Sequence, residues 1–72
     1  MDPNACANEL ADALVLDESL ASERAGDLLG WLESGGFMPN NDTLEDLEGV
    51  IGGPLDERES LCDRLREIVR AS

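Results

Sequence analysis

The spacing of leucines along the chain, interrupted by two glycine pairs, is the feature that most constrains its fold. Apolar residues recur every three or four positions in four segments, which is the period of one face of an α-helix. Gly35-Gly36 and Gly52-Gly53 interrupt this pattern. Because glycine readily adopts the left-handed conformation that ends a helix, the two pairs divide the chain into helical units. Leucine is abundant, whereas the β-branched and aromatic residues that favour strands are scarce.

Four helices are predicted from these stripes and from the residues that precede them. They cover residues 4–16, 18–34, 43–51 and 57–70. The expected N-terminal caps are Asn4, either Asp17 or Ser19, Asp42, and Asp56. Glu45 and Glu59 follow the last two caps by three residues, which is the capping-box spacing. The sequence therefore predicts an all-α fold, a compact bundle of three to four short helices, in which residues 1–72 form a single acidic domain.

The apolar stripes also predict which side chains face the core. These are Cys6, Leu10, Ala13, Leu14, Ala21, Ala25, Leu28, Leu29, Leu32, Leu44, Leu47, Val50, Ile51, Leu61, Cys62, Leu65, Ile68 and Val69. Gly26 and Gly30 lie inside the second helix, where each costs about 1 kcal/mol relative to alanine, so they indicate either a close helix–helix approach or a weakened helix. Cys6 and Cys62 are expected to be reduced and buried. A disulfide between them, closing a loop of about 55 residues, is the alternative.

Negative charge is the least ordinary feature of the composition. Seventeen Asp and Glu residues face five Arg, with no Lys and no His, and the formal net charge is −12. Fourteen of the acids fall in residues 1–57, which contain one arginine. Nucleic acids and anionic membranes are bound through cationic groups, so the composition excludes direct binding to either. A basic protein is the partner that this charge favours.

The chain shows no membrane segment and no secretion signal. No apolar run approaches the roughly 20 residues that span a bilayer. The N-terminal sequence Met1-Asp2-Pro3-Asn4 lacks the basic and apolar regions of a signal peptide. We therefore expect a cytoplasmic protein.

Catalysis is not expected from these residues. Histidine, lysine and tyrosine are absent, so the general acids and bases available near neutral pH reduce to carboxylates and two thiols. A core of this size is too small to enclose a pocket that excludes water and raises a carboxylate pKa. Residues 40–48 are rich in oxygen ligands but lack the spacing and the central glycine of an EF-hand loop. We therefore predict no enzyme, no cofactor and no metal site.

Two surfaces are candidates for partner binding. Trp31, Phe37 and Met38 either form an exposed apolar patch, which could also serve a homodimer, or complete a core that is short of bulky side chains. The candidate acidic positions are Glu23, Asp27, Asp42, Glu45, Asp46 and Glu48. The sequence thus predicts a non-catalytic interaction module, an inhibitor or an adaptor, whose acidic helical surface binds a basic protein.

Three alternatives remain open. In the first, the acidic helices imitate the charge density of DNA and block the basic groove of a nucleic-acid-binding protein, as small acidic phage inhibitors do. The second is an acidic or halophilic domain without a charged partner. The third follows from Glu18-Ser19-Leu20, which resembles over three residues the Asp-Ser-Leu motif where acyl carrier proteins, small acidic four-helix domains, carry phosphopantetheine. Glu18 replaces the aspartate of that motif, and Ser19 comes earlier in the chain than the resemblance requires.

Overall fold

The computed structural model describes residues 2–71, and every regular element within this range is an α-helix. The helices are α1 (Pro3–Leu16), α2 (Glu18–Glu33), α3 (Asn41–Ile51) and α4 (Arg58–Ala71). Each boundary lies within two residues of the predicted one. The prediction of a small all-α bundle is confirmed.

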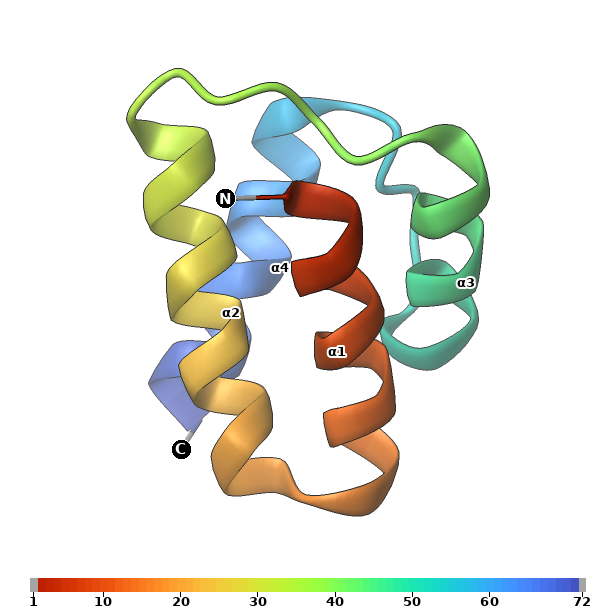
Figure 1. Cartoon of the computed structure of the whole chain (residues 1–72), viewed down its shortest axis with the longest axis vertical. Coiled ribbons are helices and arrows are strands. Elements are labelled where there is room, and N and C mark those ends of the chain that lie inside the picture. The colour runs from red at the N-terminus through yellow and green to blue at the C-terminus, as the bar shows by residue number, and fades with distance from the viewer. Residues whose placement is uncertain (1, 72) are drawn as a thin grey trace.

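In the view of Figure 1, α1 lies at the front between α2 and α3, with α4 behind. α1 and α2 form an antiparallel hairpin with a single residue, Asp17, between them. α4 packs against α2, and α3 packs against α1 on the side away from α2. α2 and α3 therefore lie on opposite sides of α1, which decides how the acidic side chains are distributed.

Leucine forms most of the core. The fully buried leucines are Leu10, Leu28, Leu47, Leu55, Leu61 and Leu65, with Leu32 almost fully buried. The predicted inward positions of Val50 and Val69 are wrong, since both side chains are exposed. Val50 is exposed because α3 packs mainly against α1, so that only a narrow stripe of α3 is covered. Val69 lies over Gly26, which has no side chain to cover it.

The two glycines within α2 do not mark a close helix contact. A Cβ atom at Gly30 would meet nothing within 4 Å, and a Cβ at Gly26 would reach only Val69 Cγ2 at 3.9 Å. The second distance is an ordinary van der Waals contact. The alternative of a close helix–helix approach is therefore wrong, and the two glycines weaken the helix without a packing reason.

The hairpin helices are capped by aspartates. Asp2 caps α1, because its carboxylate accepts the backbone N–H of Asn4 at 2.9 Å. The prediction of Asn4 as the cap is wrong, since the helix starts earlier, at Pro3, whose missing N–H is tolerated in the first turn. Asp17, one of the two predicted caps of α2, accepts the backbone N–H of Ser19 at 3.2 Å.

α3 begins two residues earlier than predicted. Asn40 caps it, because the side-chain oxygen of Asn40 accepts the backbone N–H of Thr43 at 2.9 Å. Asp42 therefore lies inside the first turn, and its predicted capping box with Glu45 is wrong. A carboxylate in the first turn still suits the positive end of the helix dipole.

The start of α4 is joined to the end of α2. α4 begins at Arg58, so the predicted cap, Asp56, lies one residue outside the position that flanks the helix. The guanidinium Nη1 of Arg58 donates hydrogen bonds to the carbonyl oxygens of Leu32 at 2.8 Å and Gly36 at 2.7 Å. The Leu32 oxygen belongs to the last turn of α2, where the helix dipole favours a cation, and the Gly36 oxygen belongs to the segment that follows the helix.

The connector over residues 52–57 also contributes to the core. Leu55 is fully buried, and its backbone N–H donates to Glu48 Oε1 at 2.7 Å. The Glu48 side chain lies against Gly53, where a Cβ atom would approach it to 2.9 Å. Sequence reasoning missed Leu55, because a single leucine between helices belongs to no periodic stripe.

Candidate functional site

The structure brings the three predicted apolar residues together at one end of the molecule. The Trp31 and Phe37 rings meet edge to face, with centroids 5.5 Å apart and an interplanar angle of 83°. Trp31 and Met38 are half-buried against the core, whereas Phe37 is 62% exposed. Each of the two hypotheses, an exposed apolar patch or a completed core, therefore holds for part of this group. Trp31 and Met38 extend the core, and Phe37 provides the exposed apolar surface.

Glycine makes the approach of Phe37 to Trp31 feasible. Gly35 ends α2 with a φ of +94°, and the Gly36 N–H donates to the Trp31 carbonyl oxygen at 2.9 Å. The chain then returns over the indole, whose Nε1–H donates to the carbonyl oxygen of Phe37 at 3.0 Å. A Cβ atom at Gly36 would overlap the Trp31 indole, so only glycine fits beneath the ring.

The predicted acidic residues do not form one surface. Glu23 and Asp27 lie one turn apart on α2, whereas Asp42, Glu45 and Asp46 are exposed on α3. These two groups belong to helices that lie on opposite sides of α1 (Figure 1). Glu48 is half-buried, and its Oε1 accepts the backbone N–H of Leu55 in the connector. The acidic surface is therefore spread around the molecule.

Few of the carboxylates are neutralised by arginine. Within residues 2–71 five of the seventeen form ion pairs: Glu9, Asp27, Glu33, Asp63 and Glu67. Arg24, Arg64 and Arg66 supply the cations, and Arg58 is bonded to carbonyl oxygens instead. The twelve carboxylates without an ion pair in this range are Asp2, Asp12, Asp17, Glu18, Glu23, Asp42, Glu45, Asp46, Glu48, Asp56, Glu57 and Glu59. All except Glu48 are exposed.

The unpaired negative charge is densest over α3 and the start of α4. Seven of the twelve unpaired carboxylates fall in residues 42–59, and the one arginine of this segment, Arg58, is bonded to the end of α2. Each of the other charged side chains there is an acid. More than half of the unpaired carboxylates within residues 2–71 therefore belong to this segment.

A second apolar surface, which the sequence analysis missed, lies where α1 meets α2. Val15 is 72% exposed, Leu16 83% and Leu20 38%. A shallow groove of about 240 Å³ begins here, with an apolar lining of Ala13, Leu16 and Leu20. The sequence does contain a signal for this surface, because Val15, Leu16 and Leu20 fall outside the apolar stripes of the first two helices.

Acidic side chains border this groove along its length. Glu9, Asp12 and Asp17 line it, together with Arg24, whose Nε lies 3.2 Å from Glu9 Oε2. The Arg24 Nε–H does not point at that oxygen, so the contact is a charge pair without an aligned hydrogen bond. Arg24 Nη1 also bonds Asp27 at 3.2 Å. The single cation of the groove is thus already shared by two carboxylates.

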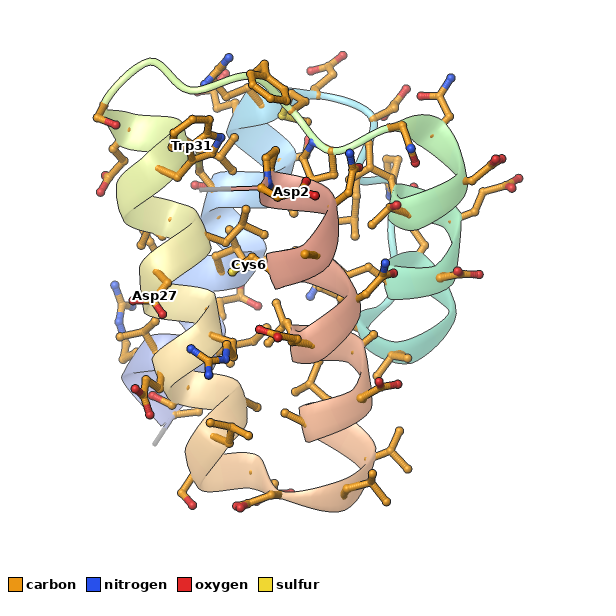
Figure 2. All side chains as sticks on the ribbon, viewed as in Figure 1. Asp2, Cys6, Asp27 and Trp31 are labelled. Carbon is orange, nitrogen blue, oxygen red and sulfur yellow. The ribbon has the colours of Figure 1, made fainter. Side chains whose placement is uncertain are left out.

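The groove continues past Arg24 toward the N-terminal end of α1. Asp2, Cys6 and Asp27 line this second part, and Figure 2 shows the three on the same face of the hairpin. The Cys6 thiol donates to the Arg24 carbonyl oxygen at 3.5 Å. Burial, with a smaller contribution from the Asp27 carboxylate, raises the pKa of Cys6. The thiol is therefore kept in its protonated, unreactive form near neutral pH.

Both cysteines are free and buried in the structure. Burial also raises the pKa of Cys62, although Arg66 opposes this shift. The disulfide considered as an alternative is therefore not formed here. Within residues 2–71 no group of three or more carboxylates or thiols is arranged to hold a metal ion.

No helix of the described chain is long and apolar enough to cross a membrane. Comparisons with known proteins give no match, whether with family models, with curated proteins or with solved structures. A function for this chain must therefore be inferred from its own charge, exposure and packing.

Proposed function

We propose that this chain is a non-catalytic interaction module that binds a basic protein through its acidic surface. The observation that supports the proposal most directly is the set of twelve carboxylates without an ion pair within residues 2–71. A net charge of −12 repels itself within the compact chain, so this surplus does not stabilise the fold. A basic partner would complement it, and electrostatic complementarity raises association rates and selects partners.

The thiols and the grooves support a non-catalytic role. Both thiols have raised pKa values, and a protonated thiol is a poor nucleophile. The grooves are shallow and open, and they do not provide the water-excluding environment in which a carboxylate becomes a general acid near neutral pH. These features support recognition through the surface as the proposed role.

The test begins with capture of partners from a lysate of the source cells on the immobilised chain. A captured protein is identified, purified and titrated against the chain at about 0.05 M and about 0.5 M salt. We expect a basic protein whose affinity falls steeply at the higher salt, because the Debye length shrinks from about 14 Å to about 4 Å. A partner that is not basic, or an affinity that does not depend on salt, would contradict the proposal.

Two variants of equal net charge locate the surface. The first replaces three acids of α3, Asp42→Asn, Glu45→Gln and Asp46→Asn. The second replaces three acids of the hairpin, Asp12→Asn, Glu18→Gln and Glu23→Gln. All six side chains are exposed and unpaired within residues 2–71. A loss of affinity in one variant alone identifies the binding face, whereas equal losses indicate attraction by net charge.

A DNA-mimic inhibitor is a second candidate, and the seven unpaired carboxylates in residues 42–59 favour it. α3 has 11 residues and is therefore about 16 Å long, a length over which duplex DNA carries about ten phosphates. α3 itself carries four acids. Mimicry would therefore need the acids of the neighbouring segment as well. It predicts that DNA and this chain compete for the captured partner, which a displacement titration measures.

A further inference from the structure

We propose that the groove between α1 and α2, together with the exposed leucines at its end, is the docking site for a cationic amphipathic helix of the partner. We call this region the hairpin groove and define it by Glu9, Asp12, Ala13, Leu16, Asp17, Leu20 and Arg24. The proposal rests on the proposed function, because it names the chemistry of the basic partner and the place where that partner binds.

The apolar part of the argument is the exposure of large side chains at one place. Val15, Leu16 and Leu20 are close in sequence at the junction of α1 and α2, and each is exposed to solvent. Leu16 and Leu20 also line the groove, on either side of Asp17. A contiguous apolar patch that adjoins a groove is typical of an interaction site.

The arrangement of the helices leaves this groove open. α3 packs on the side of α1 away from α2, and α4 packs against α2 behind the hairpin (Figure 1). Neither helix covers the face of the hairpin that Figure 2 presents to the viewer. A helix that lies between α1 and α2 on this face would make the kind of helix-in-groove contact by which amphipathic helices are recognised.

The charge of the hairpin groove favours a cationic helix as the segment that binds there. The carboxylates of Glu9, Asp12 and Asp17 border the apolar lining, and the single cation, Arg24, is already paired with two acids. A helix with leucine-like residues on one face and Lys or Arg beside them would bury the leucines and pair with the carboxylates. A second copy of this chain would bring a net charge of −12 and an identical acidic border to the contact. Repulsion therefore disfavours the homodimer.

The test uses the full chain and two synthetic peptides of about 18 residues, a length of about 27 Å. One peptide contains leucine and lysine at helical spacing, and the other has the same composition in scrambled order. Binding is measured by calorimetry, and the site by NMR shifts of the backbone amides. We expect the ordered peptide to bind at least about tenfold more tightly than the scrambled one. The largest amide shifts should fall in residues 9–24.

Two variants separate this site from Phe37, an exposed apolar side chain beyond the hairpin groove. Leu16→Ser combined with Leu20→Ser should reduce the affinity for the ordered peptide to that of the scrambled peptide. Phe37→Ser, which removes the exposed ring beside Trp31, should leave it unchanged. Circular dichroism and urea unfolding check that each variant remains folded. The opposite ranking of the two variants would place docking at Phe37 and overturn the proposal.

The remaining outcomes separate this proposal from the proposed function. Equal binding of both peptides would overturn the hairpin groove as a docking site. It would not contradict the proposal that the partner is basic. Failure of both peptides to bind at low salt would count against the basic partner as well. A dimer in light scattering that the double serine variant dissociates would assign the surface to a second copy and overturn the proposal.

Discussion

The side-chain oxygen of Asn4, in the first turn of α1, accepts a hydrogen bond from the backbone N–H of Asn40 at 2.7 Å. Asn40 in turn caps α3 through Thr43. The bond spans 36 residues of sequence and fixes the start of α3 against the start of α1. The residue that the sequence suggested as a helix cap thus holds two helices together.

Asn4→Ala should destabilise the fold by about 1 kcal/mol, because the Asn40 N–H loses its acceptor. Asn8→Ala is the matched control, since Asn8 is exposed on the same helix. Both variants replace asparagine by alanine within α1, which favours the helix in each case. Urea unfolding measures the difference between them, and Asn4→Asp, which keeps an acceptor, should restore part of the loss. Equal stabilities for the two alanine variants would show that the bond contributes nothing.

Gly36→Ala should destabilise the protein by about 1–3 kcal/mol, because the new methyl group would overlap the Trp31 indole. Gly30→Ala should stabilise it by up to about 1 kcal/mol, since a methyl group there meets nothing and alanine favours the helix. Thermal unfolding measures both. Trp31 is the single tryptophan of the chain, so its emission should move to longer wavelength in Gly36→Ala alone.

Arg58→Ala should destabilise the protein by about 1 kcal/mol, because the carbonyl oxygens of Leu32 and Gly36 lose a charged donor. Arg70→Ala makes the same change in net charge without breaking a hydrogen bond within residues 2–71. Chemical unfolding of both variants at the same salt concentration separates the two contributions. A loss of equal size in Arg70→Ala would mean that net charge alone accounts for the effect.

Asp17 gives a prediction about pH. The hydrogen bond from the Ser19 hydroxyl, followed by those from the backbone N–H groups of Leu20 and Ser19, lowers the pKa of Asp17 from 3.8. A carboxylate whose pKa is lower in the folded state stabilises that state above its unfolded pKa. The contribution is lost as the pH falls through the lowered value.

The difference in unfolding free energy between the natural chain and Asp17→Ala should therefore be larger at neutral pH than well below pH 3.8. Urea unfolding at the two pH values measures it, and an NMR titration follows the carboxyl group directly. Asp12→Ala controls for the removal of one negative charge. A difference that stays constant with pH would contradict the assignment of the shift to the folded state.

The sequence predicted the helices well because their signals are local. Leucine spacing and the two glycine pairs act within a few residues, so the element bounds were close. The predictions of Asn4 and Asp42 as caps are wrong because another acceptor lies earlier in the chain, at Asp2 and at Asn40. Several acceptors are chemically suited to cap a helix, and the exact start of the helix decides between them.

The candidate site was harder to predict because it depends on how the helices pack. The contact between Trp31 and Phe37 follows from a local chain reversal, and the sequence places Trp31, Phe37 and Met38 in one group. The separation of Asp27 from Asp42 depends on which side of α1 each helix occupies, and helical periodicity does not specify that. The exposure of Leu16 likewise depends on the absence of a neighbour over the end of the hairpin.

The peripheral position of α3 has a consequence for the order in which the molecule opens. α3 has its main helix contact with α1, and Asp42, Glu45, Asp46 and Glu48 add mutual repulsion along it. Its detachment would leave the contacts of α1 with α2 and of α2 with α4 in place. We therefore expect backbone amides of α3 to exchange with deuterated solvent sooner than those of α2, as a separate cooperative unit of lower stability.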